Sequence, residues 1–370
     1  MVRVLSEREF RLLWLGQSAS TIGDAMVMVA IALYVTAIGT PTDVGLVLAA
    51  HSLTLVACLT LGGVWADRLP RHRVMLATDF IRGSLHALLA ALILTGSVEV
   101  WMIAAIEAVY GAAEAFFRPA YTGLVPQTVP EPMLPDANAA TAIVQTVAEF
   151  LGPALATVLV LGIGAGWAFA FDALTFVVSA CFLARLRPRS RGEAVAGGSV
   201  LSDLREGWSE FWARAWVWAT VLIFCFLAVV AFAPWQVLAP TVAQDRYGSR
   251  ALFGTLAAAL GVGTIAGALC AFRLRPRRPM LAAFVGCVPW PLSIVLFAAG
   301  APRALSRVSA YDWMGSLGLL PIAYIAVGPV ADALGATAVL AAGGAIGCFL
   351  VLLGFAIPDI WRLRRLEAPV

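Results

Sequence analysis

The chain has 370 residues, of which 61% are hydrophobic and only 13% are charged, and its formal net charge is +3. Soluble domains carry about 25% charged residues, so this composition excludes a soluble globular protein and indicates an integral membrane protein. The small net charge gives no reason to expect a nucleic-acid partner. The length accommodates about ten to twelve transmembrane helices of about 20 residues each.

The apolar runs of the first half predict an N-terminal unit of six transmembrane helices within residues 1–185. We expect these helices over residues 11–38, 43–66, 74–96, 100–123, 137–162 and 166–185. Residues 186–214 then change in character, with arginines, glycines and serines that predict a cytoplasmic linker containing an amphipathic helix. Ser202 is a suitable N-cap for that helix.

The C-terminal half, residues 215–370, repeats this plan with one apolar run fewer. We expect its helices over residues 215–240, 250–272, 280–300, 311–331 and 334–357, and the absent span belongs near residues 300–305. If the chain starts in the cytoplasm and all eleven runs cross the membrane, the arginines near the C-terminus lie on the outer side, where arginine-rich segments are disfavoured. We therefore expect the segment 280–300, which is interrupted by Pro289 and Pro291, to be distorted or re-entrant.

The basic residues are all arginines, 25 in number, and lysine-free chains of this kind are typical of GC-rich bacterial genomes. Short loops rich in arginine stay on the cytoplasmic side, which predicts a cytoplasmic N-terminus and a bacterial plasma membrane. The clusters are Arg3, Arg8 and Arg11; Arg68, Arg71 and Arg73; Arg185, Arg187, Arg189 and Arg191; Arg273, Arg275, Arg277 and Arg278; and Arg362, Arg364 and Arg365.

Two repeated halves and one charged loop together resemble the major facilitator superfamily. The loop between Gly63 and Arg73 has the pattern Gly-x-x-x-Asp-Arg-x-x-Arg-x-Arg. The pair Gly152-Pro153 in the fifth predicted helix adds to this resemblance. Smaller similarities favour the bacterial efflux branch that resembles the enterobactin exporter; they are Gly23-Asp24, Asp79-x-x-Arg82 and Phe117-Arg118-Pro119-Ala120. The chain departs from the family because the middle of its fourth helix, around Glu107, has no arginine and because one span of the second half is missing.

The resemblance implies a fold and a gate. The fold is an all-α major facilitator-type bundle of two pseudo-repeated halves, with about 11 (nominally 12) transmembrane helices and a shortened second half. In the gate, Gly63, Asp67, Arg68, Arg71 and Arg73 would latch the inner helix ends in one state and release them in the other. Gly63 would allow close helix approach. The alternative is that the arginines only fix the topology.

One further group takes its role from the same resemblance, and a second takes its role from its spacing. Glu149, Gly152 and Pro153 would form a bend in the fifth helix that accompanies export by antiport, and the alternative is a simple proline kink. Asp79 and Arg82 are three residues apart close to the inner loop, where we expect an internal ion pair that braces the gate rather than a substrate contact.

Ionisable residues inside transmembrane helices are costly and mark functional sites. Asp24 lies near the centre of the first predicted helix, where hydrocarbon disfavours the charged carboxylate. It therefore suits proton coupling or substrate contact, and the alternative is a hydrogen-bonded structural carboxyl. Glu107 and Glu114 share one helix face that we expect to line the cavity, and Arg118 lies four residues beyond Glu114 and can pair with it. Asp172 is expected in the interior of the half.

The second half is nearly free of buried charge, with Gln236 and Asp312 as its polar exceptions. Coupling should therefore lie in the first half, and the second half should supply an aromatic wall that favours a lipophilic substrate; the wall residues are Phe224, Phe226, Phe232, Trp235 and Trp290. The three histidines, His51, His72 and His86, have no metal-ligand spacing, so we expect neither metal transport nor a cofactor.

These patterns predict a monomeric secondary transporter that exports a hydrophobic or amphiphilic small molecule, such as a drug, siderophore or secondary metabolite. Proton antiport with alternating access is the expected mechanism. One alternative is an internally shortened, inactive transporter. Another is an intramembrane transferase, which would require a cluster of catalytic residues at one membrane face, and the sequence contains no such cluster.

Overall fold

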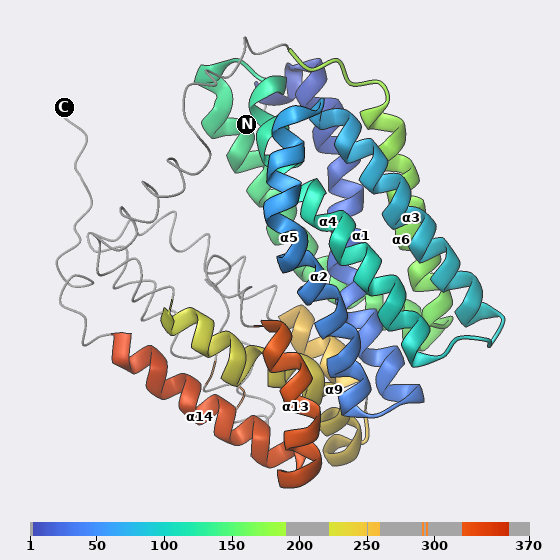
Figure 1. Cartoon of the computed structure of the whole chain (residues 1–370), viewed down its shortest axis with the longest axis vertical. Coiled ribbons are helices and arrows are strands. Elements are labelled where there is room, and N and C mark those ends of the chain that lie inside the picture. Colours follow the sequence, from blue (N-terminus) through green and yellow to red (C-terminus); the bar gives the residue numbers. More distant parts are fainter. Residues whose placement is uncertain are drawn as a thin grey trace.

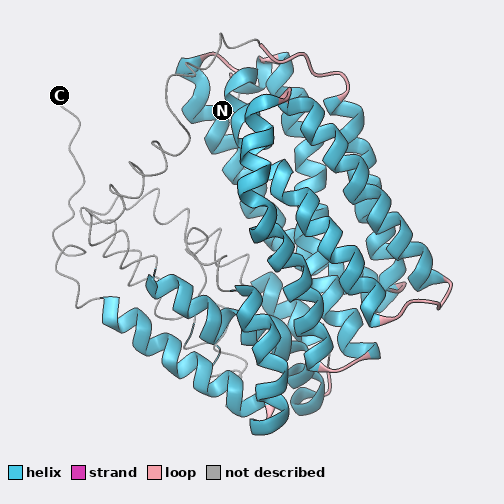
Figure 2. Ribbon diagram, viewed as in Figure 1, coloured by secondary structure: helices cyan, strands magenta, loops and turns pink. Residues whose placement is uncertain are grey.

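The computed structural model describes residues 3–189, 222–249, 251–259 and 320–354, together with Pro291 and Ile294. Every regular element in these ranges is helical (Figure 2). The first half contains α1 (Arg8–Ile38), α2 (Pro41–Arg68), α3 (Arg71–Leu94), α4 (Val100–Thr128), α5 (Leu134–Gly162) and α6 (Ala165–Leu183) (Figure 1). These are the six helices expected, and the fold is an all-α membrane bundle.

Helix boundaries differ from the expected ones where local chemistry extends a helix. Helix α2 begins at Pro41 because Thr40 and Asp43 form a capping box in front of it, and proline is favoured in the first turn. Helix α4 does not end at residue 123 but continues to Thr128, with Pro119 and Pro126 inside it. The prediction for this end was wrong because prolines are tolerated in transmembrane helices that neighbours support.

The second half is described in three parts. A helical span over Leu222–Tyr247 includes the π-helical turn η3 (Ala228–Phe232) and α9 (Ala233–Tyr247). It is followed by a helical segment at residues 251–259 and then by α13 (Leu320–Leu334) and α14 (Ala336–Gly354). The predicted end of the first span at residue 240 was wrong, because α9 continues through Pro240 to Tyr247, and prolines are tolerated in transmembrane helices that neighbours support. Eight helices among the described residues are long and apolar enough to cross a membrane.

Several expectations concern residues outside the described ranges. These are the amphipathic helix of the linker, the distorted segment at 280–300, the missing span near 300–305, Asp312, Trp290 and the membrane side of the C-terminus. The domain boundaries at 185 and 215 also stay predictions.

Three arginine-rich segments of the first half gather at one end of the bundle, the upper end in Figure 1. Arg189 Nη2 donates to Glu7 Oε2 over 2.7 Å, and its backbone N–H donates to the carbonyl of Gln127 over 3.0 Å. Arg71 Nη1 donates to the carbonyl of Gly123 over 2.6 Å. The arginine clusters of the described first half therefore share one end of the bundle, as the topology rule requires.

Helices α2 and α4 lie in close backbone contact. A Cβ on Gly62 would overlap the carbonyl oxygen of Ala115, and one on Gly111 would overlap the carbonyl oxygen of His51. Thr54 Oγ1 donates to the carbonyl of Ala108 over 2.6 Å. The close approach expected at Gly63 occurs at Gly62 instead: outside the local helix backbone, no described atom lies within 4 Å of a Cβ placed on Gly63. Gly62, one residue earlier, faces α4.

This neighbouring pair of glycines gives a matched test of packing. Gly62→Ala should lower the free energy of unfolding by about 1–3 kcal/mol, since the added methyl group must displace the α4 backbone. Gly63→Ala adds the same group in open space and should be neutral or slightly stabilising. Thermal denaturation of the two purified variants in detergent checks the difference, and equal melting temperatures would contradict the α2–α4 contact.

The described parts of the two halves meet at the end away from the arginines (Figure 1, where α13 lies beside the start of α2). Thr42 Oγ1 donates to Asp332 Oδ2 over 3.1 Å. A Cβ on Gly45 would overlap the carbonyl of Tyr324, and one on Gly328 would overlap Thr42. Glycines on both sides therefore bring α2 and α13 into direct backbone contact.

Candidate functional site

A polar network fills the interior of the first half, between α1, α2, α3, α4 and α6. Its members are Gln17, Asp24, His51, Asp79, Arg82, His86, Glu107, Tyr110, Glu114, Arg118, Asp172 and Ser179. Polar groups within a transmembrane bundle must find partners in the protein, and most side-chain polar atoms of this network find one within it, although Arg82 Nε has no hydrogen-bond partner among the described residues.

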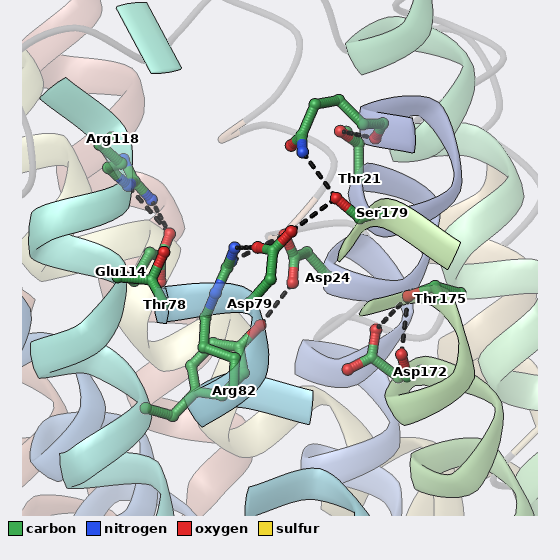
Figure 3. Close-up of polar contacts among 12 residues, drawn as sticks. Thr21, Asp24, Thr78, Asp79, Arg82, Glu114, Arg118, Asp172, Thr175 and Ser179 are labelled. Atoms are coloured by element: carbon green, nitrogen blue, oxygen red, sulfur yellow. Dashed lines mark hydrogen bonds and ion pairs between the residues drawn. The ribbon is translucent and has the colours of Figure 1, made fainter. Parts of the chain in front are cut away.

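Arg82 on α3 is at the centre of the network and is fully buried. Its Nη2 donates to Asp79 Oδ1 over 2.6 Å, and its Nη1 lies 3.5 Å from Asp24 Oδ2 on α1 (Figure 3). The guanidinium carbon lies 4.1 Å from the ring centre of Phe117 and 4.5 Å from that of Phe176. Two carboxylates and two aromatic faces thus compensate the desolvated charge.

The two carboxylates on Arg82 are held differently. Asp79 is completely buried and also accepts a hydrogen bond from Ser179 Oγ over 2.5 Å, and Ser179 accepts one from Gln17 Nε2 over 2.8 Å. Asp24 accepts from Tyr110 O–H, but 36% of its side chain is exposed. Asp79 is therefore fixed by three helices, whereas Asp24 is accessible and has the longer contact with the arginine.

A second chain of contacts runs through two histidines. His86 Nδ1 lies 2.5 Å from Asp172 Oδ2, and its Nε2 lies 3.2 Å from Glu107 Oε1. His51 Nδ1 lies 3.1 Å from Glu107 Oε2, and its Nε2 lies 3.1 Å from Glu114 Oε2. All four imidazole nitrogens therefore face carboxylate oxygens, and Glu107 bridges the two rings.

This histidine chain ends at the less buried side of the half. Arg118 donates to Glu114 Oε1 from Nη2 over 2.7 Å and from Nε over 2.9 Å, which is the pair that the spacing predicts. The side chain of Glu114 is 17% exposed and that of Arg118 is 37% exposed. At the opposite end, Asp172 is fully buried, in the interior as expected.

The structure thus brings four of the five predicted cavity residues into one network: Asp24, Glu107, Glu114 and Arg118. The fifth, Gln236, lies half-buried on α9 outside this network. Asp79 and Arg82 form the expected ion pair, but that pair joins the network by contacting Asp24 and Ser179. Trp235 of the proposed aromatic wall is buried against Phe253.

The loop residues are placed less completely. Arg68 at the end of α2 and Arg73 on α3 are exposed, and the side chain of Asp67 is outside the described part. Arg71 ties the start of α3 to α4 through Gly123. The role of these residues as a latch stays a prediction.

The Gly-Pro pair of α5 lies directly against the site. A Cβ on Gly152 would come within 2.7 Å of Ala25, the residue after Asp24. Pro153 lies inside the helix, which continues to Gly162, and Glu149 is half-buried one turn earlier. The close approach of α5 to α1 explains the glycine, while the antiport role of the bend stays a prediction.

Sequence reasoning missed His51, His86, Tyr110, Ser179 and Gln17, because it weighed the histidines only as metal ligands. A usable signal was present on two helices. Asp79, Arg82 and His86 have spacings of three and four residues, and Glu107, Tyr110 and Glu114 have the same spacings. Each set therefore forms one polar stripe in an otherwise apolar helix, and the two stripes face each other: the rings of His86 and Tyr110 stack 4.3 Å apart.

Known proteins share both sequence and fold with this chain. Macrolide efflux protein A of Streptococcus pyogenes is 24% identical over 65% of this chain and 60% of its own length, so the matched segment spans less than two thirds of that relative. Multidrug efflux pump Tap of Mycolicibacterium fortuitum is 27% identical over 89% of this chain and 90% of its own length. The putative bacilysin exporter BacE of Bacillus amyloliquefaciens is 31% identical over 46% of this chain and 42% of its own length.

Two solved structures show the same fold. The nucleoside transporter NupG, as its D323A mutant, superposes with a TM-score of 0.60 over 95% of this chain and 89% of its own, at 14% identity. A bacterial homologue of the human lysosomal transporter Spinster, in an inward-facing and unoccupied conformation, gives a TM-score of 0.60 over 93% and 78% at 18% identity. The family model for a transmembrane secretion effector matches residues 3–296. The chain therefore belongs to this family of multi-pass membrane transporters within the major facilitator superfamily.

Proposed function

We propose that the chain exports a hydrophobic or amphiphilic small molecule across the bacterial plasma membrane by proton antiport with alternating access. The observation that carries this proposal is the asymmetry at Arg82. One carboxylate partner, Asp79, is buried and fixed, and the other, Asp24, is accessible and held over 3.5 Å. A carboxylate that can leave a buried cation is suited to alternate between a proton and an ion pair.

The proposed cycle follows from this geometry. When Asp24 is ionised, it pairs with Arg82 and with Tyr110 O–H. When Asp24 takes up a proton, its attraction to the guanidinium disappears, while Asp79 keeps Arg82 in place. Antiport then requires only that substrate and proton exclude each other at Asp24, so that each binds in a different half of the cycle.

Relatives support the substrate class. They are named as efflux proteins for macrolides, for multiple drugs and for bacilysin. In this chain, the second half contributes aromatic apolar side chains that are not fully buried, since Phe224 and Phe232 are half-buried and Phe226 is exposed. We infer a lipophilic substrate with a polar or cationic group that can approach Asp24.

Alternating access supplies a cross-linking prediction. The contact between Thr42 and Asp332 (3.1 Å) joins the two halves at the end away from the arginines, and opening of that end must break it. In a background with the six cysteines replaced, Thr42→Cys with Asp332→Cys should form a disulfide that abolishes export, and reduction should restore it. Export by the oxidised double variant would contradict alternating access at this contact, and each single cysteine variant serves as control.

Accumulation of ethidium and of erythromycin in cells tests the function. Cells that express the chain should retain several-fold less of at least one compound than cells with an empty vector. A protonophore should remove the difference, since it abolishes the proton gradient that drives export. If expression of the chain changes the level of neither compound, the proposal gives way to the inactive transporter.

A further inference from the structure

We infer that His51, Glu107, His86 and Asp172 form a second proton-binding site, separate from Asp24, which exchanges protons with the cavity through Glu114. We call these four residues the histidine relay. Its part in export rests on the proposed function, whereas the exchange of protons itself does not. The contacts of the relay come from α2, α3, α4 and α6.

The first argument counts hydrogen atoms. An ionised carboxylate can only accept hydrogen bonds, and a neutral imidazole carries one N–H. The relay and Glu114 make four contacts between imidazole nitrogens and carboxylate oxygens, at 2.5 to 3.2 Å. Each contact is a hydrogen bond only if a proton lies in it. Four hydrogen bonds require four protons, and two neutral histidines supply only two. The relay and Glu114 therefore hold two protons more than two neutral rings between ionised carboxylates would hold.

The second argument counts charges. The network contains five carboxylates and only two guanidinium groups, those of Arg82 and Arg118. Asp24 and Asp79 face Arg82, and Glu114 faces Arg118. Glu107 and Asp172 have no arginine within ion-pair distance among the described residues, and each contacts a histidine instead. Charge buried in a low dielectric must be compensated, so protons on the relay take the place of the missing cations.

The third argument concerns access. The relay has a closed end, because Asp172 is fully buried and its carboxyl occupies the space left by the absent side chain of Gly23. At its other end, His51 Nε2 contacts Glu114, whose side chain is 17% exposed. Both nitrogens of each imidazole are engaged, so a proton accepted at one nitrogen can leave from the other without movement of the ring. Protons therefore enter and leave by way of Glu114.

The relay also lies beside the proposed coupling carboxylate. The ring of Tyr110 stacks on His86 at 4.3 Å, and its hydroxyl donates to Asp24. Removal of a proton from the relay must leave one imidazole–carboxylate contact without its hydrogen, next to the residue that contacts Asp24. The two proton sites are thus neighbours joined through Tyr110 while remaining chemically distinct.

Nuclear magnetic resonance of the full chain with nitrogen-15-labelled histidine tests this inference, because the chain has only three histidines. His51→Gln and His86→Gln assign the signals, and His72, outside the relay, is an internal reference. We expect the His51 and His86 signals to change together from imidazolium to neutral imidazole as the pH rises between about 5 and 10. The same change should occur in Asp24→Asn, since the relay is separate from Asp24.

Three results would overturn the inference. The first is that neither imidazole changes protonation in this range, which would make the relay a static set of ion pairs or of neutral contacts. The second is that the change disappears in Asp24→Asn, which would leave a single proton site. The third is that Glu114→Gln leaves the His51 signal unaltered, which would exclude access through Glu114. The measurement requires no substrate, so a chain that exports no tested compound can still show the exchange. If the histidine variants fail to fold, a joint change of two of the three histidine signals still tests the exchange, because it requires no assignment.

Discussion

Arg82→Ala is expected to lower the free energy of unfolding by about 3–5 kcal/mol, because it leaves a buried carboxylate without its cation. Asp79 is completely buried, and after the substitution only the hydroxyl of Ser179 would remain as its donor. The change would also remove the group that lies over Phe117 and Phe176 and leave a cavity. Fluorescence-detected size exclusion after heating in detergent measures the effect.

Arg118→Ala is the matched control, since it removes the same side chain from another ion pair in the same network. The Arg118 side chain is 37% exposed and, among the described residues, its ion pair is with Glu114, so the loss should be below about 1 kcal/mol. The double variant Arg82→Ala with Asp79→Asn should recover part of the lost stability, because the uncompensated charge is removed. Equal melting temperatures for Arg82→Ala and Arg118→Ala would show that Arg82 is not the structural centre.

Asp24→Asn is expected to reduce proton-driven export by about 100-fold or more while leaving the melting temperature nearly unchanged. Asparagine retains the contact with Tyr110 but cannot take up and release a proton, and Arg82 keeps its shorter ion pair with Asp79. Export of ethidium by cells and thermal stability of the purified protein are measured on the same variant.

Asp79→Asn serves as the comparison, because its main expected effect is on stability. It removes the fixed carboxylate and leaves buried Arg82 with Asp24 alone, so stability should fall as much as in Arg82→Ala. Glu131→Gln, at an exposed position after α4, should change neither property. Full export by a stable Asp24→Asn protein would remove Asp24 from the coupling role.

Much of the fold could be predicted because each helix of the first half is an apolar run bounded by charges or turn residues. The arginines near Arg71 and Arg189 predicted a common face, and the structure places both at one end. The predictions that were wrong concerned helix ends: α4 passes through Pro126, and α9 passes through Pro240. A sequence does not show which prolines a neighbouring helix will support.

The candidate site could be predicted only within single helices. The pair of Glu114 with Arg118 and that of Asp79 with Arg82 follow from spacing along one helix, and both are present. Contacts between helices depend on register and rotation, which no spacing reveals. Asp24 therefore had no predicted partner, although Arg82 reaches it from a residue 58 positions away.

The histidines illustrate the same limit more strongly. His51 lies 56 positions from Glu107, and His86 lies 86 positions from Asp172. A lone histidine in an apolar helix carries no sign of its partner, so only packing of α2, α3, α4 and α6 could reveal the relay. The sequence could not show which glycine of α2 makes the close helix contact for the same reason, since adjacent Gly62 and Gly63 differ only in the side of α2 on which they lie.

Proton flow measured in proteoliposomes tests the coupling role of Asp24 most directly. Purified protein would be reconstituted with a pH-sensitive dye inside the vesicles, and ethidium would be added outside. The wild type and Glu131→Gln should move protons against ethidium, in the opposite direction and in fixed proportion, and Asp24→Asn should show no ethidium-dependent proton flow. Undiminished proton flow in Asp24→Asn would contradict the account.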